Sequence, residues 1–293
     1  MPVDLNTIYA KLINLLLDTV FVVDEHGLIV YVSDACEELL GYTAQEMIGT
    51  TIFDYVLPDD LEATRAAAAS VTGGEHQINF ENRYRHRDGR AVHILWSARW
   101  YEQDRLRIGV ARDITALKQA EMHLRFLAHH DPLTGLTNRS LFADRVETAL
   151  HAADRHNSGL ALLFLDLNDF KPINDQFGHE MGDQLLIQVA RRLEQCTRDS
   201  DTVARMGGDE FTVLLTDIDS HRNLATAIEK IRNTLAAPFK LGDQSVSVSC
   251  SIGTALYPED GQTASALLSC ADGRMYDHKR GAQLAAVGRS LEG

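Results

Sequence analysis

The sequence has few cysteines and few basic residues for its length of 293 residues. Its four cysteines form no CxxC pair, which argues against a disulfide-rich secreted scaffold and favours reduced thiols. The 28 Lys and Arg residues are outnumbered by 42 Asp and Glu residues, giving a net charge of −14. Because phosphate backbones are bound by a surplus of basic residues, this balance argues against nucleic-acid binding as the main function.

Long apolar runs are also missing. No uninterrupted run reaches the roughly 18 residues that a membrane-spanning helix needs. The first residues show neither a basic segment nor a small-residue cleavage site. We therefore expect a cytoplasmic protein without a membrane segment. Since one domain typically has about 100–200 residues, the length predicts two domains.

The first part of the sequence predicts a mixed domain with an antiparallel sheet. Residues 8–17 have the pattern of a short amphipathic helix, and residues 19–34 form two apolar runs around an Asp-Glu-His-Gly turn, as in a β-hairpin. Short helices separated by glycines follow over residues 35–52. Residues 77–101 predict two long strands around an Asp-Gly turn, and residues 105–115 predict a closing strand.

Three segments of this region carry a resemblance: "VFVVDEHGLIVYVSDACEELLGYTAQEMIG", "HRDGRAVHILWS" and "GVARDIT". Together they resemble a PAS sensor domain, which we place at residues 1–116 with its N-terminal helix. Trp96 and Trp100 alternate on an apolar strand face, which is more typical of a core than of a ligand wall. Four histidines are candidate haem ligands by residue type alone, and each is more often a surface or packing residue: His26, His76, His86 and His93. The PAS ligand therefore stays unknown, and a PAS domain without one is compatible with the sequence.

Residues 117–130 predict a helix between two domains. Leu117, Ala120, Leu124 and Leu127 have the a/d spacing of a coiled coil, with charged residues between them. Two heptads are short, so a single amphipathic linker is one interpretation. The other is a signalling helix that pairs with a second copy, and its position between two domains favours this one.

The second half alternates predicted helices and strands, which indicates an α/β domain on a mixed sheet. A helix is expected from about Ser140, and another carries apolar Leu185, Leu186, Val189 and Leu193. A third predicted helix ends before Pro238. The strongly alternating segment 244–258 predicts one strand, and a last helix follows.

Two groups of acids lie where predicted strands end. Asp166 ends the apolar run "LALLFLD", and Asp209 and Glu210 follow the glycines of "ARMGGDEF" on a hairpin tip. Carboxylates brought together raise each other's pKa unless a positive charge lies between them. Because carboxylate oxygens suit Mg²⁺, a divalent metal is the simplest such charge. Gly207 and Gly208 leave room for a ligand against the turn.

The segment "NDFKPINDQFGHEMGD" adds groups that suit a nucleotide. Lys171 can contact phosphates, and Asn174 and Asp183 can bond the edge of a base. Taken singly, these residues are also typical of solvated surfaces and helix caps. In combination with a metal site they predict a nucleoside triphosphate site.

"DPLTGLTNR", "FLDLNDFKPINDQFGHEMGD" and "ARMGGDEF" occur in this order. They resemble the motifs of the GGDEF family, the diguanylate cyclases, over residues 131–293. The resemblance implies a nucleotidyl-cyclase-like α/β domain that condenses two GTP into cyclic di-GMP and two pyrophosphates. It also implies a homodimer, formed through the PAS domain and the helix, because each domain holds one GTP of a two-fold symmetric product.

The same resemblance implies residue roles. Asp166, Asp209 and the Leu167 carbonyl would bind Mg²⁺ (or Mn²⁺), with Glu210 supporting that site. Asp209 and Glu210 would be catalytic together with Lys171, which faces the phosphates. The remaining substrate-binding residues would be Asn174, Asp183, Gly207, Gly208 and Lys279. Arg198 and Asp201 form an RxxD before the glycine turn, which in this family is an inhibitory site for cyclic di-GMP.

The last helix departs from the family pattern. Ala282 or Gln283 stands where an arginine normally follows the lysine, and Arg280 is the nearest replacement. This departure leaves open a weak or inactive domain that acts as a receptor for GTP or cyclic di-GMP. A cyclase with a mononucleotide product is disfavoured by the complete nucleotide segment.

Overall fold

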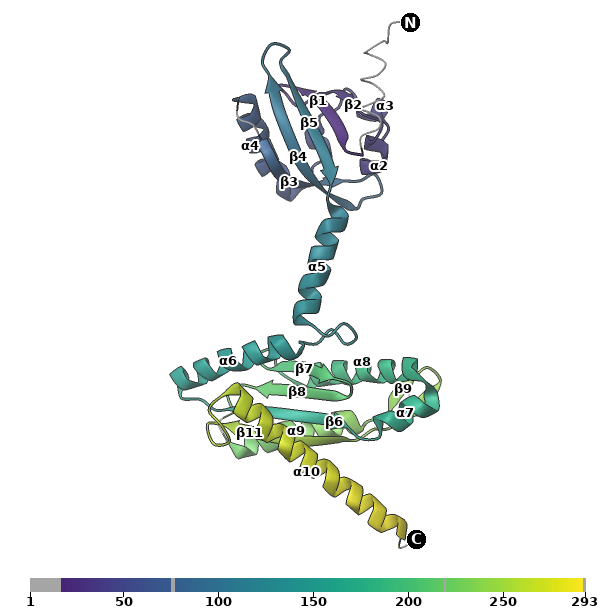
Figure 1. The fold of residues 1–293 in the computed structure, drawn as a ribbon, viewed down its shortest axis with the longest axis vertical. Coiled ribbons are helices and arrows are strands. Elements are labelled where there is room, and N and C mark those ends of the chain that lie inside the picture. Colours follow the sequence, from purple (N-terminus) through teal and green to yellow (C-terminus); the bar gives the residue numbers. More distant parts are fainter. Residues whose placement is uncertain (1–16, 75–76, 219, 292–293) are drawn as a thin grey trace, which may run out of the picture. The chain divides into compact units, whose positions relative to one another are not determined.

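The computed structural model describes residues 17–74, 77–218 and 220–291, with the backbone alone for residues 77, 78 and 282–291. The chain divides into two compact units, one up to His123 and one from Leu124 onward (Figure 1). The helix predicted at residues 8–17 lies almost entirely outside the described residues. No helix of the described part is long and apolar enough to cross a membrane.

The first unit contains a five-stranded antiparallel sheet in the order β2-β1-β5-β4-β3. The strands are β1 (Thr19–Asp24), β2 (Ile29–Val32), β3 (Gln77–Arg85), β4 (Ala91–Tyr101) and β5 (Leu106–Asp113). The helices are α2 (Cys36–Leu40), α3 (Ala44–Met47) and α4 (Leu61–Thr72), with 3₁₀ turns at Ile52–Tyr55 and Pro58–Asp60. The predicted hairpins and short helices are confirmed.

Local side-chain bonds explain where these elements begin and end. The Asp24 carboxylate accepts the N–H groups of His26 (2.9 Å) and Leu28 (2.8 Å), which closes the turn of the first hairpin. Thr43 and Glu46 form a reciprocal capping box at the start of α3. Both signals are local in sequence, so the pattern of the chain was sufficient to predict these elements.

Trp96 belongs to the buried core of this unit and is 9% exposed, as its alternation predicted. Its indole nitrogen donates to the Asn82 side chain at 2.9 Å. Trp100 is half-buried instead of part of the core, because it lies near the end of β4, where its indole donates to Glu102 at 2.7 Å.

The linker is helix α5 (Thr115–His129), and none of its side chains is buried in this structure. Leu117, Leu124 and Leu127 are exposed although they are apolar. Asn138 joins the end of this helix to the next one. Its amide nitrogen donates to the Ala128 carbonyl (2.9 Å), and its oxygen accepts the Leu141 N–H (3.0 Å).

The second unit contains a four-stranded sheet in the order β11-β6-β8-β7. Its strands are β6 (Leu160–Leu167), β7 (Thr202–Gly207), β8 (Glu210–Leu215) and β11 (Cys250–Tyr257). All its strand pairs are antiparallel, and a parallel bridge of Thr137 and Ala204 lies beside them. The expected α/β fold is confirmed, and the parallel direction within it occurs in this bridge. β6 and β7 run the same way, but the hairpin strand β8 lies between them, so they do not pair.

Helices cover both faces of this sheet, and Figure 1 shows α10 crossing it beside β6 and β11. The helices are α6 (Arg139–His156), α7 (Phe170–Phe177), α8 (His179–Cys196), α9 (His221–Ala236) and α10 (Ala264–Leu291). One core packs α8 and α9 against the sheet, and the other packs α6 and α10. β6 is buried at all eight positions, as its continuous apolar run predicted. The apolar positions predicted for α8 are buried: Leu185, Leu186, Val189 and Leu193.

The strand predicted over residues 244–258 is two strands. β10 (Gln244–Val246) pairs with β9 (Phe239–Leu241) in a separate hairpin, and β11 joins the main sheet only from Cys250. The sequence alternation continues through the residues between them, so the pattern alone did not reveal the change of partner.

Candidate active site

Three carboxylates meet at one end of the two central strands. Asp166, the penultimate residue of β6, is 6% exposed and lies directly opposite Glu210, the first residue of β8. Asp209 precedes Glu210, and its carbonyl accepts the Leu167 N–H at 3.3 Å. The structure therefore brings together the acids that the sequence placed at two separate strand ends.

The glycine turn beside these acids is open. Gly207 and Gly208 have φ values of 143° and 53°, which L side chains rarely adopt. A Cβ built on either glycine would meet nothing within 4 Å. A ligand could therefore approach the backbone of the turn that precedes Asp209.

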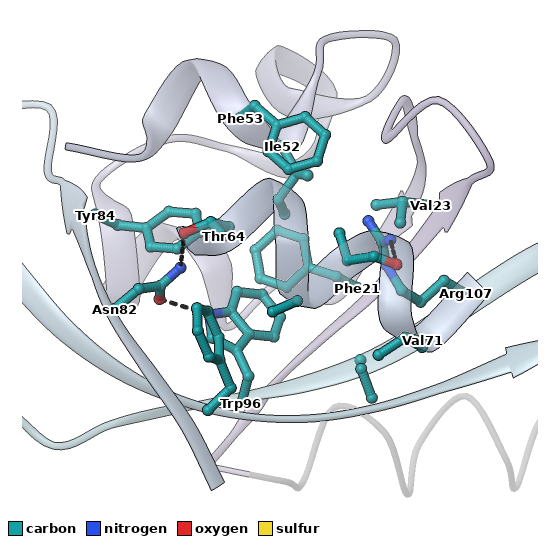
Figure 2. Close-up of a pocket in the computed structure, with 15 residues that line it drawn as sticks. Phe21, Val23, Ile52, Phe53, Thr64, Val71, Asn82, Tyr84, Trp96 and Arg107 are labelled. Atoms are coloured by element: carbon teal, nitrogen blue, oxygen red, sulfur yellow. Dashed lines mark hydrogen bonds between the residues drawn. The ribbon is translucent and has the colours of Figure 1, made fainter. Parts of the chain in front are cut away.

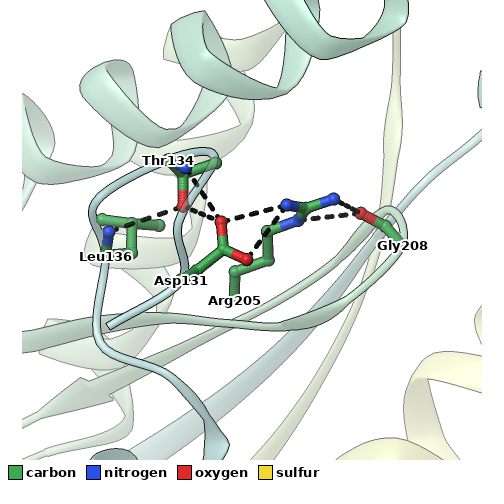
Figure 3. Close-up of polar contacts among 5 residues, drawn as sticks. All are labelled: Asp131, Thr134, Leu136, Arg205 and Gly208. Atoms are coloured by element: carbon green, nitrogen blue, oxygen red, sulfur yellow. Dashed lines mark hydrogen bonds and ion pairs between the residues drawn. The ribbon is translucent and has the colours of Figure 1, made fainter. Parts of the chain in front are cut away.

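Arg205 fixes this turn to the loop that follows α5 (Figure 3). Its Nε and Nη2 donate to the Gly208 carbonyl at 3.0 and 2.8 Å, and its Nη1 pairs with Asp131 at 3.0 Å. Asp131 also accepts the N–H and hydroxyl of Thr134. Burial alone would raise the pKa of Asp131, but the bonds from Thr134 and Arg205 lower it overall.

Sequence reasoning missed the roles of Asp131 and Arg205. Asp131 opens the motif "DPLTGLTNR", and Arg205 stands two residues before the first turn glycine. The sequence did contain a signal for an ion pair, because one motif carries an acid, Asp131, and the other carries a base, Arg205. The contact between them depends on the fold and joins residues 74 positions apart.

Lys279 supplies positive charge to the acid cluster. Its Nζ lies 2.6 Å from Asp166 Oδ1, reaching from α10 to the end of β6. Burial raises the pKa of Asp209 and of Glu210, the nearby Asp166 raises both further, and Lys279 acts in the opposite direction. Burial would lower the pKa of Lys279, but its bond to Asp166 and the other two acids raise it overall.

The donor atoms of this cluster suit a hard divalent cation. Carboxylate oxygens are preferred by Mg²⁺, which is often bound by one or two carboxylates together with substrate phosphates. In the described residues no three acidic, histidine or cysteine side chains are already grouped as a complete metal site. The carboxylates of Asp166, Asp209 and Glu210 are donors of the type that such a cation would use, and substrate phosphates would have to supply further ligands.

A second polar group lies on the helices that follow β6. Asn174 on α7 has a buried side-chain oxygen without a hydrogen-bond partner in the described structure. That oxygen points at Gly182 on α8, where an added Cβ would lie only 1.8 Å from it. The Asn174 side chain as a whole is half-exposed, and the adjacent Asp183 is exposed. The amide N–H₂ of Asn174 and the Asp183 carboxylate are thus a donor and an acceptor offered to a ligand.

The remaining predicted residues are not part of the acid cluster. Lys171 is exposed on α7 and makes no hydrogen bond or ion pair with any residue described here. Asp201 accepts the N–H groups of Arg198 (2.9 Å) and Thr216 (3.2 Å), so its carboxylate closes the turn before β7. The Arg198 side chain is exposed. The side chains of Ala282 and Gln283 lie outside the described residues.

Comparisons with known proteins agree with these motifs. The family described as "Diguanylate cyclase, GGDEF domain" matches residues 128–283, and the PAS fold family matches residues 29–109. The bifunctional diguanylate cyclase/cyclic di-GMP phosphodiesterase MucR of Pseudomonas aeruginosa is 46% identical over 165 residues, covering 56% of this chain and 24% of MucR. Diguanylate cyclase TpbB of the same organism is 45% identical over 168 residues, covering 57% of this chain and 39% of TpbB. The chain thus spans less than half the length of these relatives.

Solved structures resemble the second unit. The GGDEF domain of TpbB is 46% identical with a TM-score of 0.51, covering 52% of this chain and 89% of that one. The coiled coil and GGDEF domain of DgcB from Caulobacter crescentus, in complex with c-di-GMP, is 27% identical with a TM-score of 0.51, covering 57% and 89%. The family match covers more than half of the chain and includes the acid cluster, the glycine turn and Lys279. The chain belongs to the GGDEF family, with a PAS domain ahead of its GGDEF domain.

Proposed function

We propose that the chain is a diguanylate cyclase that condenses two GTP into cyclic di-GMP and two pyrophosphates. The observation that carries this proposal is the group of three carboxylates beside the open glycine turn, with Asp166 opposite Glu210 and bonded to Lys279. Such a group concentrates negative charge where a metal-bound triphosphate would lie. Relatives that are named diguanylate cyclases support the same reaction. Because GTP is a cytoplasmic metabolite, the proposed reaction places the protein in the cytoplasm.

Different residues of the chain would bind the base and the phosphates of the substrate. Asn174 and Asp183 hold the guanine edge through the N–H₂ donor and the carboxylate acceptor. Lys171 and Lys279 contact the phosphates, which lie against Gly207 and Gly208. Mg²⁺ or Mn²⁺, when bound by Asp166, Asp209 and the Leu167 carbonyl beside Glu210, supplies positive charge to the phosphates.

Asp209 would act as the proton acceptor. Without metal, burial and the neighbouring Asp166 raise its pKa. A bound Mg²⁺ would offset that repulsion, and Asp209 or the metal that it holds would then help to remove the proton of the 3′-hydroxyl. The 3′-oxygen of one GTP forms a bond to the α-phosphorus of the other. Its proton passes to Asp209, and the bond from that phosphorus to the departing pyrophosphate oxygen breaks. The same step repeated by the facing domain closes the ring.

The reaction requires two GGDEF domains that face each other, so we propose a homodimer formed through the PAS domain and α5. The apolar side chains of Leu117, Leu124 and Leu127 on this helix are exposed and suit pairing with a second copy. DgcB offers a parallel, since it was solved with a coiled coil next to its GGDEF domain. The spacing of the paired helices would transmit the state of the PAS domain to the GGDEF domains.

We also propose product inhibition at Arg198 and Asp201. The exposed Arg198 guanidinium can bond a phosphate or a guanine edge in a fork. Asp201 would exchange its bonds to backbone N–H groups for bonds to a guanine. The complex of DgcB with c-di-GMP supports binding of the product by a related domain.

A receptor without turnover is the second candidate. It is favoured by one observation, the replacement of the usual arginine by Ala282 or Gln283 in the last helix. The two candidates differ in what an incubation with GTP and Mg²⁺ yields. A receptor would return GTP or cyclic di-GMP bound and unconverted, whereas a cyclase would form new cyclic di-GMP.

Comparison of the native chain with Asp209→Ala tests the proposal. The variant should lose synthesis by at least about a thousandfold, as expected when a proton acceptor and metal ligand are removed together. Circular dichroism should show an unchanged fold, because Asp209 is a half-buried turn residue. Native-like synthesis by the variant would remove the proposed role of this carboxylate.

A further inference from the structure

A small cavity lies inside the PAS domain, between the sheet and α4. It has a volume of about 60 Å³. Figure 2 shows Arg107, Val23 and Val71 at one end and Asn82, Trp96 and Thr64 at the other. Most of the other lining side chains are apolar, among them Phe21, Ile52, Phe53 and Phe80. No histidine lines this cavity among the described residues, and its size excludes a haem macrocycle.

The polar groups at the Asn82 end are already satisfied by one another. Asn82 accepts from the Trp96 indole at 2.9 Å and donates to Thr64 at 2.9 Å. Thr64 in turn donates to the Asp60 carbonyl at 2.7 Å. This end therefore has a structural explanation and requires no ligand.

The Arg107 end has no comparable explanation. Arg107 on β5 faces inward and is 9% exposed, although buried arginines are normally paired with an acid. No carboxylate among the residues described here forms an ion pair with it. A guanidinium has five N–H donors. Within the described residues, the Arg107 side chain makes one hydrogen bond, from Nη1 to the Ala68 carbonyl at 3.1 Å.

The acceptor of that bond, the Ala68 carbonyl, also has another hydrogen-bond donor. The Ala68 carbonyl already accepts the Thr72 hydroxyl at 3.0 Å within α4. Asp24 is near enough to raise the pKa of Arg107, but it forms no ion pair with Arg107 in the described structure, and its Oδ1 accepts two N–H groups of its own turn. Burial lowers the pKa of Arg107, which shows that this position disfavours the charge that it carries.

The cavity has a route to solvent at the Arg107 end. An open surface cleft shares Phe53, Ala68 and Arg107 with the cavity lining, so the guanidinium lies between the two spaces. Arg65 lines the cleft as a second cation. The acid Glu25 at the cleft is paired with Arg105. A small anion could therefore approach Arg107 from this side, although Asp54 also lines the cleft.

We propose that the PAS domain binds a short-chain monocarboxylate, with its carboxylate on Arg107 and its alkyl chain in the cavity. A guanidinium is a planar fork that matches a carboxylate with two parallel bonds. Among the residues that line the cavity itself, Arg107 is the one cation, and this suits an anion with one charge. The apolar lining suits a hydrocarbon chain, and a volume of about 60 Å³ holds about two groups of the size of a water molecule, which corresponds to a chain as short as that of propionate.

The test measures the thermal midpoint of the full-length chain in increasing sodium propionate. We expect a saturable increase at millimolar concentrations, because a ligand that binds only the folded state stabilises it. Sodium chloride at equal ionic strength and the neutral isostere propionamide should give no saturable increase. An equal effect of propionamide, or no effect of propionate, would overturn the proposal.

Arg107→Met should abolish the propionate response, and Arg107→Lys should weaken propionate binding about tenfold because it keeps the charge but loses the fork. The matched control is Arg112→Met, which makes the same change at an exposed position of the same strand and should respond like the native chain. Without propionate, Arg107→Met should have a thermal midpoint equal to or above the native one. A strongly reduced midpoint together with a retained propionate response would mean that Arg107 is only structural.

Discussion

The substitution Gly182→Ala tests the proposed contact of Asn174 with the base without changing any residue that we assign to the site. An added Cβ would lie 1.8 Å from Asn174 Oδ1, 2.9 Å from its Cγ and 3.3 Å from Phe170 Cζ. Since side-chain carbons essentially never approach other atoms within 3.0 Å, the Asn174 amide must leave its present position. Gly182 itself lies inside α8, where alanine is favoured over glycine by about 1 kcal/mol.

The magnitude follows from one lost hydrogen bond to the base. Such a bond contributes about 1–1.5 kcal/mol, which corresponds to about a tenfold decrease in kcat/KM for GTP. Inhibition by tripolyphosphate, which has phosphates but no base, should be unchanged. In an Asn174→Ala background, Gly182→Ala should have no further effect, because both changes remove the same contact.

The assay follows pyrophosphate release at varied GTP concentration, with Gly273→Ala as the matched control. Gly273 is also a helical glycine, but a Cβ added there would meet nothing within 4 Å, so kcat/KM should stay within about twofold of the native value. The reasoning is refuted if Gly182→Ala keeps the native kcat/KM. It is also refuted if tripolyphosphate inhibition weakens as much as GTP binding.

Three further substitutions test other parts of the account. In metal-free protein, Asp209→Asn should raise the thermal midpoint at pH 8, and calorimetry should find a smaller gain at pH 4. The raised pKa of Asp209 means that its charge destabilises the fold at high pH and is neutralised as the pH falls through that pKa, so equal gains would contradict this. Arg205→Lys loses the fork onto Gly208 and Asp131 and should lower the free energy of unfolding in urea by about 2 kcal/mol and kcat about tenfold, whereas native values of both would exclude a positioning role. Arg198→Ala should weaken inhibition by cyclic di-GMP at least about tenfold without changing the initial rate. An unchanged inhibition curve would mean that Arg198 and Asp201 only form a turn.

The sequence predicted the local elements well because their signals are local. Turn residues and apolar periodicity placed the PAS hairpins, β6 and the buried face of α8. Periodicity carries no information on which strands become neighbours. For this reason the antiparallel order of the second sheet and the switch of partner before Cys250 were not predicted.

The site was predicted as a set of residues but not as a set of contacts. The ends of the strands gave Asp166, Asp209 and Glu210, and the structure adds that Asp166 faces Glu210 across the sheet. The bond between Lys279 and Asp166 joins residues 113 positions apart, and sequence spacing does not report such a distance in space. The same limitation applies to the contact of Gly182 with Asn174.

The buried arginine of the PAS domain shows a different limitation. The segment "RLRIGVAR" alternates, so a strand was predicted, but arginines occur on both faces of that pattern. Only the packing of α4 over the sheet shows that Arg107 faces inward while Arg112 faces solvent.

Diguanylate cyclase activity is measured by incubating the purified chain with GTP and Mg²⁺ and resolving the nucleotides by chromatography. We expect cyclic di-GMP, with two pyrophosphates released for each molecule formed. The rate per protomer should increase with protein concentration, because two GGDEF domains must face each other. Intact GTP and no cyclic di-GMP at any protein concentration, with propionate present or absent, would mean that the chain is not a diguanylate cyclase.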